Sequence, residues 1–362
     1  MNWETEKVFH DGDSFFKSVL ESIDGAKNSV RLEYYIFSEG VLAYRFLRAI
    51  QNAVARGVRV DLGLDAIGTL RMSTSFFNEI VASGTKFRIY HPLPRIFFLF
   101  TSKFWRRLFR INQRNHRKIC LVDERILFVG GMNVDDWHLI EVKGKEAWRD
   151  SGVCVTSKDL SILTRNLEVV WHKKKKETDF GEIKLPILLN DGRFRRRRLN
   201  RTFISRIKSS NRRVWITSPY FTPPARLLLA LIDSGRRGVD TRLLLPSRAD
   251  HFFSRPMNGL FYPMLLSSGV KIYEYTMTTL HAKTAVLDNW VLVGTSNRNH
   301  RSFFYDLEVD VILSYPDSIR EMEKQFIEDL RFSKAVNLKK WNERHWIYRI
   351  FEKILWLVHK WT

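Results

Sequence analysis

The same series of short sequence segments occurs twice along the chain in the same order, and this internal repeat constrains its fold more than any other feature. Residues 55–62 match residues 236–243, and the Ser-Gly pair at 83–84 matches the pair at 268–269. Each match places a glycine after a helical run and before an alternating apolar run, which is the pattern of a helix end followed by a strand. The order helix, strand, helix, strand, strand recurs, so the sequence predicts two α/β halves built around strand-rich cores.

Composition narrows the class of protein and its partners. A chain of 362 residues with 44% apolar residues can fill a large core, which excludes a disordered chain, and two cysteines are too few for a disulfide framework. The polar start of the chain is unlike a secretory signal, and no uncharged apolar run reaches the ~18 residues of a membrane-spanning helix. The formal net charge of +21 predicts a soluble or peripheral protein with an anionic partner, either nucleic acid or the negative face of a membrane.

The two halves differ by one insertion and are joined by a basic segment. From Gly84 to His116 is 32 residues but from Gly269 to His281 only 12, so the first half has 20 extra residues near 93–114, which are aromatic and basic together. We expect a first lobe at 1–171, a basic linker at 172–198, a second lobe at 199–340 and a tail at 341–362. The runs of four lysines and four arginines in the linker are typical of a solvated segment, and a specific anion site is the alternative.

A short polar motif recurs at matching places in the two halves. Its residues are His116, Lys118, Asp123 and Asn133 in the first half and His281, Lys283, Asp288 and Asn297 in the second. Because side chains alternate along a strand, the histidine and the lysine two positions later share one face. A hairpin turn near the aspartate then returns the chain and brings the asparagine back beside the histidine. Each half is therefore expected to present an imidazole, an ammonium and a carboxamide on one surface.

These groups suit the chemistry of a phosphodiester. An imidazole can attack phosphorus or protonate a leaving oxygen near neutral pH. A lysine and an asparagine supply donors to the non-bridging oxygens as charge builds in the transition state. Two such sets facing each other provide one nucleophile and one general acid, so no metal and no other cofactor is expected. Two matches at equivalent places of a repeated fold make a chance pattern a poor explanation.

The paired motifs resemble the phospholipase D superfamily, whose mark is two copies of His-x-Lys-x-x-x-x-Asp followed by Gly-[Gly/Ser/Thr]-x-Asn. The resemblance extends over about residues 11–332. It implies an α/β fold of two lobes, each a mixed sheet flanked by helices, with the active site at the lobe interface and a covalent phosphohistidine intermediate. By position, His116 resembles the nucleophile and His281 the acid that later becomes the base.

The resemblance also implies roles for the other polar residues. Lys118, Lys283, Asn133 and Asn297 match the positions that hold the phosphate. Asp123 and Asp288 belong to the catalytic motif, although a structural or polar-network role suits them better than proton transfer. Asp150 and Glu308 resemble the acidic residues that orient each histidine through its second ring nitrogen. The second hairpin is one residue shorter, which leaves the roles of Thr295 and Ser296 open.

The motifs alone do not name the substrate, because the superfamily includes lipases, phosphatidyltransferases and nucleases. Residues 115–119 and 148–150 resemble bacterial cardiolipin synthases of the B type, which lack amino-terminal membrane spans. The resemblance implies a phosphatidyltransferase that makes cardiolipin from phosphatidylglycerol, or from phosphatidylglycerol and another phospholipid, through a phosphatidyl-histidine. The alternatives are a nucleic-acid phosphodiesterase or nuclease, a phospholipase D hydrolase, and a binding module without catalysis. The aromatic residues occur in clusters and are not spaced singly as they are where they stack on bases, which argues against a nucleic-acid substrate.

Two segments have the composition of membrane contacts. The insertion interleaves Phe97, Phe98, Phe100 and Trp105 with arginine and lysine, as an interfacial segment does. In the tail at 341–362, apolar residues recur at helical spacing, which favours a membrane-associating amphipathic helix over one packed on the protein's own core. We therefore expect a peripheral protein on the cytoplasmic face of a bacterial cell membrane, with anionic phospholipids as partners and substrates and no nucleic acid.

Overall fold

The computed structural model describes residues 2–70, 72–92, 113–171, 182–248 and 254–344. Its first lobe contains a seven-stranded sheet with the strand order β1-β7-β6-β5-β2-β3-β4. The strands are β1 (Thr5–Phe9), β2 (Ser29–Ile36), β3 (Arg59–Gly68), β4 (Lys86–Tyr90), β5 (Ile119–Val122), β6 (Ile126–Gly130) and β7 (Gly152–Thr156). The helices are α1 (Gly12–Asp24), α2 (Val41–Ala55), α3 (Thr74–Ala82), α5 (Ile140–Lys143) and α6 (Ser161–Trp171).

The second lobe repeats this arrangement. Its eight-stranded sheet has the order β15-β11-β10-β9-β12-β13-β14-β8. The strands are β8 (Ile187–Leu189), β9 (Arg213–Thr217), β10 (Asp240–Pro246), β11 (Lys271–Tyr275), β12 (Thr284–Leu287), β13 (Trp290–Gly294), β14 (Val309–Leu313) and β15 (Ser333–Ala335). The helices are α7 (Arg193–Ser209), α8 (Ala225–Arg236), α9 (Ser254–Gly259), α10 (Tyr262–Leu266), α11 (His300–Phe304), α12 (Pro316–Arg331) and α13 (Leu338–Asn342).

The two sheets are equivalent strand for strand. Read from the opposite end, the second sheet has the strand order β8-β14-β13-β12-β9-β10-β11. Each of these strands has the same position, direction and place along its lobe as the corresponding strand of the first sheet. β15 is an additional strand at the far edge. Three strands of each sheet run parallel, and the motif hairpins (β5–β6 and β12–β13) pair antiparallel with the innermost of them. Two mixed sheets flanked by helices confirm the predicted fold class and its duplication.

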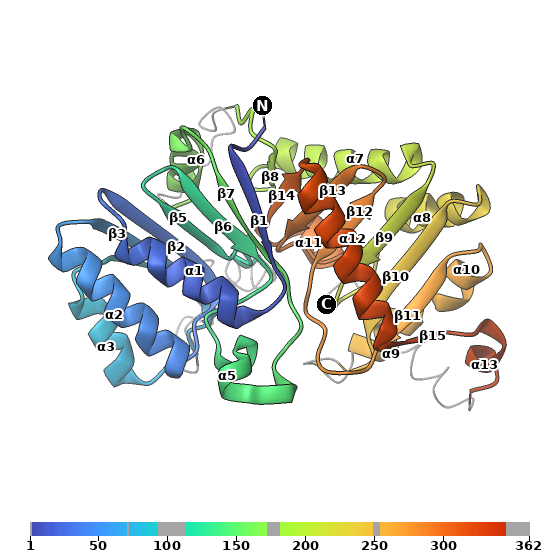
Figure 1. Cartoon of the computed structure of the whole chain (residues 1–362), viewed down its shortest axis with the longest axis horizontal. Coiled ribbons are helices and arrows are strands. Elements are labelled where there is room, and N and C mark those ends of the chain that lie inside the picture. The colour runs from blue at the N-terminus through green and yellow to red at the C-terminus, as the bar shows by residue number, and fades with distance from the viewer. Residues whose placement is uncertain (1, 71, 93–112, 172–181, 249–253, 345–362) are drawn as a thin grey trace, which may run out of the picture.

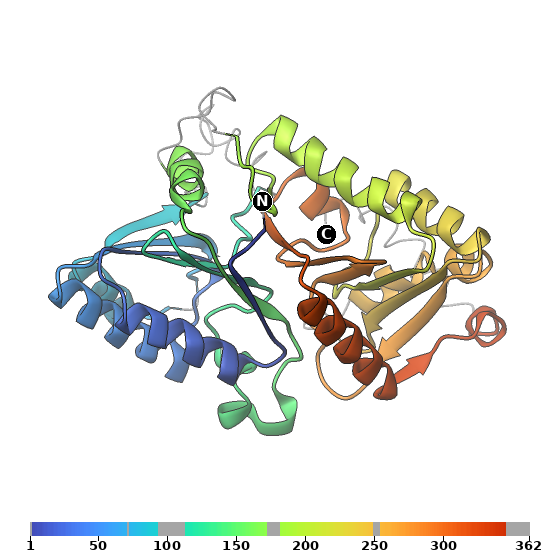
Figure 2. The same cartoon turned by 45° about the horizontal axis from the view of Figure 1, so that its top comes forward.

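The sheets pack against each other, and each keeps helices on its outer face (Figure 1). Alternating residues of β5, β6 and β7 enter a shared apolar core with residues of β12, β13 and β14, and α6 and α12 border it. The remaining residues of each sheet point outward into separate cores, beneath α1, α2 and α3 in the first lobe and beneath α7, α8 and α10 in the second. Figure 2 shows these two helical layers on opposite outer sides of the molecule.

Folded structure begins earlier than the expected boundary of the second lobe. The range 172–198, expected as a linker, contains β8 and the first six residues of α7. Helix α7 is anchored by Leu199, Phe203 and Ile207, which lie four residues apart and are buried. Its arginines precede this apolar stripe, so the basic run is the start of a helix and not a solvated connection.

The hairpin turns explain the one-residue difference between the motif copies. Three residues connect β5 to β6, whereas two connect β12 to β13. Asp123 and Asp288 open these turns with φ angles of 50° and 49°, a conformation that Asp and Asn adopt more readily than most residues. Because the length difference lies within the turn, the register of the returning strands and of the glycine that follows them is preserved.

Candidate active site

The catalytic motifs come together because segments of each lobe pair with the other lobe by backbone hydrogen bonds. The N–H of His116 donates to the carbonyl of Leu307 at 3.0 Å, and the N–H of Leu307 donates to the carbonyl of Arg114 at 2.8 Å. The equivalent pair joins His281 to Arg149 at 2.8 Å and Arg149 to Thr279 at 2.9 Å. Each histidine therefore lies next to the acidic residue that precedes an equivalent strand of the opposite lobe, β14 for His116 and β7 for His281.

The first of these pairs is His116 with Glu308. Nδ1 of His116 lies 3.1 Å from both carboxylate oxygens of Glu308. The hydroxyls of Thr295 and Ser302 also donate to Glu308, one to each oxygen, at 2.5 Å. Because these oxygens act as acceptors, Nδ1 carries the proton and Nε2 of His116 keeps its lone pair. The side chain of His116 is 11% exposed, which leaves an edge of the ring open to the cleft.

The second pair is His281 with Asp150. Nδ1 of His281 lies 2.6 Å from Oδ2 of Asp150, and both residues are buried. Gly131 makes this possible, since a Cβ at that position would lie 2.2 Å from Oδ1 of Asp150. In the second lobe the equivalent position is Thr295, whose hydroxyl contacts Glu308 instead. Asp150 therefore lies against a glycine, whereas Glu308, at the equivalent place in the other lobe, accepts a hydrogen bond from the hydroxyl of a threonine.

The two lysines are held in the same way in both lobes. Nζ of Lys118 donates to the carbonyl of His116 at 2.8 Å, and Nζ of Lys283 donates to the carbonyl of His281. Nζ of Lys283 also lies 3.0 and 3.1 Å from the two ring nitrogens of His281. Both lysines are buried, so their ammonium groups are positioned before any substrate arrives.

The electrostatics of the site follow from burial and from the mutual repulsion of these cations. Burial and then the charge of Lys118 hold the pKa of His116 well below its usual range, so its imidazole is neutral at pH 7. Burial and then Lys283 lower the pKa of Lys118 to about 7. Burial raises the pKa of Glu308 to about 7 and raises the pKa of Asp150 above its usual range. A bound anionic phosphate would offset the repulsion between the two lysines.

The two asparagines of the motif are buried beside the histidines. The carboxamide oxygen of Asn133 accepts a hydrogen bond from the N–H of Ile36 at 3.1 Å, which leaves its amino group available as a donor. Asn297 is 4% exposed, and its carboxamide oxygen has no hydrogen-bond partner among the described residues. Both backbone amides are fixed by the side chain five positions later, His138 for Asn133 and Ser302 for Asn297.

The two motif aspartates lie outside the active site, which corrects their grouping with the catalytic residues. Asp123 accepts hydrogen bonds from the N–H groups of Lys27, Asn28 and Ser29 at 2.7–2.8 Å. Asp288 accepts three equivalent bonds from the backbone of residues 211–213 at 2.9–3.0 Å. They stand five positions beyond the lysines, about 16 Å along an extended strand. Their carboxylates attach each hairpin to the start of the central strand of its sheet.

His138 is a polar residue of the site that inspection of the sequence missed. Its Nε2 accepts the N–H of Asn133 at 3.2 Å, and its Nδ1 lies 4.0 Å from Oδ2 of Asp150. Burial lowers its pKa to about 3. His138, Asp150 and His281 also form the group among the described residues whose side-chain atoms, within 4.8 Å of one another, could ligate a metal ion. Aligning the repeats would have revealed it, because His138 and Ser302 are each five residues after a motif asparagine.

A cavity of about 750 Å³ opens beside both histidines, between the lobes. Tyr35, which lines it, has its ring centroid 5.0 Å from that of His116, and Trp148 lies 5.2 Å from His281. At its mouth Leu70 is 66% exposed, Met277 55% and Trp137 36%. The lining combines apolar side chains with the charged Asp135, Lys145, Glu146 and Arg248, and the cavity approaches the two histidines through Tyr35 and Trp148.

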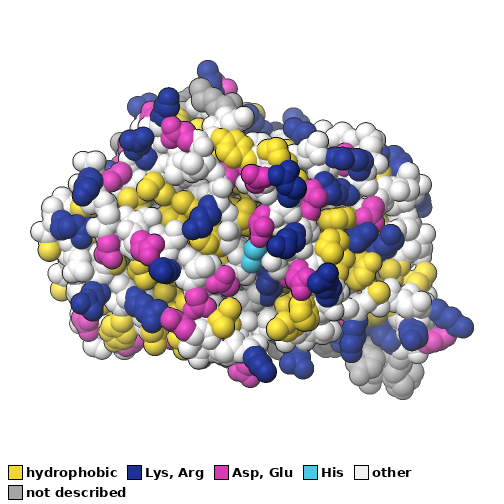
Figure 3. All heavy atoms as spheres, viewed as in Figure 1, with side chains coloured by type: hydrophobic (Ala, Val, Ile, Leu, Met, Phe, Trp, Pro, Cys, Tyr) yellow, Lys and Arg dark blue, Asp and Glu magenta, His cyan; other side chains and the backbone are white. Residues whose placement is uncertain are grey.

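The expected membrane contacts cannot be compared with these features directly. Phe97, Phe98, Phe100 and Trp105 lie outside the described residues, as does the tail from residue 345 onward. Across the described ranges, the helices are too short or too polar to cross a bilayer. Figure 3 shows Lys and Arg side chains scattered over one face of both lobes among Asp and Glu, so the positive charge is not confined to one patch of that face.

Comparisons with known proteins agree with the site. The family model "Cardiolipin synthase, PLD-like domain" matches residues 19–171 and 203–330. The cardiolipin synthase of Geobacillus kaustophilus is 30% identical over 96% of this chain and 70% of its own length. That of Clostridium perfringens strain SM101 is 29% identical over 97% and 75%.

Solved structures give the same fold. The phosphatidylserine synthase of Haemophilus influenzae matches with a TM-score of 0.72 and 12% identity over 99% of this chain and 93% of its own. The polyphosphate kinase of Porphyromonas gingivalis matches with a TM-score of 0.66 and 14% identity over 97% and 53%. The duplicated motifs, the crossed histidine–carboxylate pairs and these relatives lead to one assignment: the chain belongs to the phospholipase D-like cardiolipin synthase family.

Proposed function

We propose that this protein is a phosphatidyltransferase that joins two phosphatidylglycerol molecules into cardiolipin and releases glycerol. In the first step a histidine nitrogen bonds to the phosphorus of the donor, the bond from phosphorus to the glycerol oxygen breaks, and the second histidine gives that oxygen a proton. In the second step the same histidine takes the proton from a hydroxyl of the acceptor, whose oxygen attacks phosphorus and displaces the first histidine. Each step breaks one bond to phosphorus and forms one, and the proton that the second histidine gives up in the first step returns to it in the second.

The observation that carries the proposal is the different environment of the two histidines. The neutral ring of His116, with Nδ1–H directed at Glu308, has its Nε2 lone pair available, and Nε2 has no hydrogen-bond partner among the described residues. Nδ1 of His281 instead lies 2.6 Å from the buried carboxylate of Asp150, which favours a protonated ring, and His281 is more deeply buried than His116. This supports His116 as the nucleophile and His281 as the general acid and base, with Glu308 and Asp150 as their positioning residues.

The remaining groups of the site would stabilise the transferring phosphate. Lys118, Lys283, Asn133 and Asn297 converge from two symmetric sets, so donors approach the phosphorus from both lobes. Such preorganised donors in a buried site stabilise the pentacoordinate transition state more than the ground state, because negative charge on the equatorial oxygens increases there.

The partly apolar cavity beside both histidines supports a lipid as substrate. A phospholipid phosphate lies at headgroup depth in the bilayer, so the mouth of the site must rest on the membrane surface. The exposed Leu70, Trp137 and Met277 at this mouth would contact the interface. Peripheral attachment to a cytoplasmic membrane leaflet, with the segments at 93–112 and 345–362 as further contacts, completes the proposal.

The test follows the lipid product and the covalent intermediate. Purified protein incubated with phosphatidylglycerol vesicles should form cardiolipin and free glycerol, detected by mass spectrometry, and His116→Ala and His281→Ala should each abolish turnover. His281→Asn should accumulate phosphatidyl-labelled protein, whereas His116→Asn should not, and the reverse pattern would exchange their roles. EDTA should leave the rate unchanged. Loss of activity with EDTA, restored by Zn²⁺, would make His138, Asp150 and His281 metal ligands and refute this mechanism.

A further inference from the structure

A second cavity, of about 470 Å³, is lined by arginines and lies on the His116 side of the site. Its lining includes Arg193, Arg196 and Arg197 from the start of α7, together with His91 and Gln113. An apolar wall is formed by Phe303, Phe304 and Leu307. The cavity thus combines arginine side chains, of which Arg193 and Arg197 are exposed, with an apolar wall, which is the combination a phospholipid headgroup and its glycerol backbone require.

Among the described residues, no carboxylate is paired with the arginines that line this cavity. The nearest carboxylates are already paired, Asp191 with Arg117 and Arg195, and Asp306 with Arg301. Within the described part of the chain, Arg193 and Arg197 make no ion pair. The guanidinium of Arg196 donates to two backbone carbonyls, and its buried Nε has no partner.

The placement of these arginines also opposes the stability of their own helix. Five arginines occupy the first six positions of α7, and its N-cap residue Gly192 provides no side-chain acceptor. The helix dipole and the unpaired N–H groups at this end favour anions and disfavour cations. A local conflict of this kind, beside a cavity, indicates a function that a bound anion would serve.

The cavity is continuous in sequence with the catalytic centre. Gln113 precedes His116 by three residues, about 10 Å at most in an extended chain, and Leu307 immediately precedes Glu308. By the pseudo-symmetry of the lobes, Gln113 corresponds to Thr278, which lines the larger cavity on the His281 side. The reacting phosphorus would therefore lie between two cavities, one partly apolar and one lined by arginines.

We propose that the arginine cavity is the acceptor subsite and binds the phosphodiester of the incoming phospholipid, an inference that rests on the proposed function. In the second step the attacking hydroxyl belongs to a glycerol that carries its own phosphate a three-carbon bridge away. Arg193 and Arg197 hold that phosphate, and Arg196 and its backbone partners position the wall around it. The subsite thereby favours a phospholipid over water as the group that resolves the covalent intermediate.

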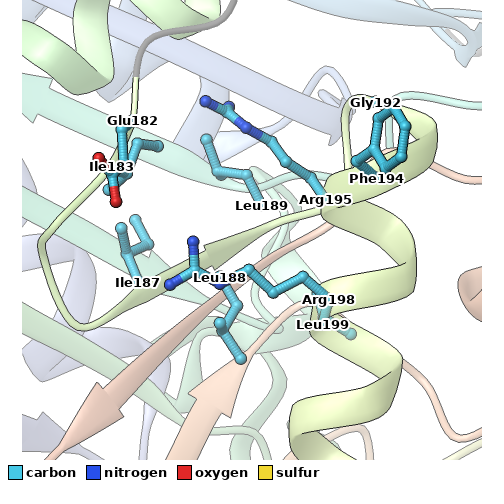
Figure 4. A pocket seen from close by; sticks show the side chains of 10 residues that line it. All are labelled: Glu182, Ile183, Ile187, Leu188, Leu189, Gly192, Phe194, Arg195, Arg198 and Leu199. Carbon is cyan, nitrogen blue, oxygen red and sulfur yellow. The ribbon is translucent and has the colours of Figure 1, made fainter. Parts of the chain in front are cut away.

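The same helix offers a matched control in two arginines that do not line this cavity. Arg198 lines a separate pocket of about 230 Å³ with Ile183, Ile187 and Leu199 (Figure 4). Arg201 is exposed and lines neither cavity. Arg198→Gln/Arg201→Gln removes the same charge from α7 as Arg193→Gln/Arg197→Gln without touching the proposed subsite.

The experiment measures how one intermediate is divided between acceptors. With phosphatidylglycerol vesicles, the ratio of cardiolipin to phosphatidic acid reports transfer to lipid against hydrolysis, and both products come from the same phosphatidyl-enzyme. Arg193→Gln/Arg197→Gln should lower this ratio at least about tenfold, as expected for the loss of two charge-assisted contacts. The control variant should keep the wild-type ratio. Parallel losses of both products, or equal ratios in the two double variants, would overturn the proposal.

A second arm identifies the source of the phosphate. Glycerol 3-phosphate, added in solution, offers the same anion and hydroxyl without acyl chains. Its conversion to phosphatidylglycerophosphate by the wild type, and not by Arg193→Gln/Arg197→Gln, would identify a subsite for phosphate monoesters as well. Selective use of the lipid acceptor would restrict it to membrane phosphodiesters. If the wild type transfers to no acceptor at all and yields only hydrolysis, the proposed function fails, irrespective of the arginines.

Discussion

At the scale of single residues, two copies of one motif acquire different chemistry through their surroundings. His116 and His281 occupy equivalent positions, but one faces Glu308 with two hydroxyl donors and the other faces Asp150 beside a third histidine. The ammonium of Lys283 contacts the ring of His281, whereas the ammonium of Lys118 donates to the backbone carbonyl of His116. Duplication supplies the side chains, and in the proposed mechanism the differences in their neighbours separate the roles of nucleophile and acid.

The first residue-scale prediction concerns pH. Since the pKa of His116 is well below 6.5, the nucleophile stays neutral through pH 6, and kcat/KM should show no loss from this group there. Since the pKa of Lys118 is about 7, its charge disappears above pH 7, and kcat/KM should fall toward tenfold per pH unit. In kcat the fall should occur at higher pH, because a bound phosphate anion raises the pKa of the lysine.

Steady-state kinetics between pH 5.5 and 9.5 on a soluble short-chain substrate would measure this profile. Lys118→Arg is the control, because a guanidinium does not titrate in this range. It should lower the rate but remove the alkaline fall that Lys118 causes. A wild-type kcat/KM that stays constant from pH 7 to 9 would contradict the assigned role.

The sequence anticipates the motif residues well and their partners poorly. His and Lys two apart on a strand share a face in any sheet, so Lys118 and Lys283 beside their histidines follow from local geometry. Which carboxylate reaches which histidine depends on the packing of the lobes, which no local pattern encodes. His138 was missed because it belongs to neither motif copy, and only its place five residues after a motif asparagine, which Ser302 shares in the second lobe, points to it.

At the scale of secondary-structure elements, the hairpin aspartates are the clearest structural device. Asp123→Ala removes three charge-assisted hydrogen bonds to N–H groups and places alanine at a positive φ, so the free energy of unfolding should fall by about 2–4 kcal/mol. Urea denaturation would measure it, and the folded variant should keep its kcat within a few-fold. Glu124→Ala, at the neighbouring position of the same turn with φ 54°, is the matched control and should cost less.

The same variant has a pH signature. Burial raises the pKa of Asp123, but hydrogen bonds from the backbone of Ser29, Lys27 and Asn28 outweigh this effect and hold the pKa below its usual range. A carboxyl with a lowered pKa stabilises the fold above its unfolded pKa of about 3.9, and the stabilisation disappears as pH falls through the folded value. The stability difference between wild type and Asp123→Ala should therefore be complete near pH 6 and decrease below pH 4. A constant difference over this range would attribute it to backbone strain alone.

Helix α7 illustrates where element-scale prediction from sequence failed. Its first turns hold so many arginines that the pattern resembles a solvated linker, and the apolar stripe begins only at Leu199. The stripe of Leu199, Phe203 and Ile207 has clear helical spacing, but the boundary depends on how far the helix extends beyond it.

At the scale of the whole molecule, attachment to a bilayer should depend on the mouth of the larger cavity. Leu70→Ser/Met277→Ser should reduce flotation with anionic vesicles several-fold, because two exposed apolar side chains at the interface are lost. Leu229→Ser/Phe332→Ser removes similarly exposed side chains that line none of the cavities described above and should bind normally. Equal binding of all variants would place the membrane contact elsewhere, with Phe97, Phe98 and Phe100 as the next substitutions to examine.

The four backbone hydrogen bonds between the lobes also restrict how substrates enter and products leave. A hinge motion that separates the lobes would break all four hydrogen bonds, at a free-energy cost of about 4 kcal/mol. It would also separate both histidines from their carboxylates. The shared apolar core behind them would also be exposed to water. We expect the interior to stay closed through the reaction cycle. Under the proposed function, a four-chain product would then leave laterally along the cleft while the two lobes stay joined.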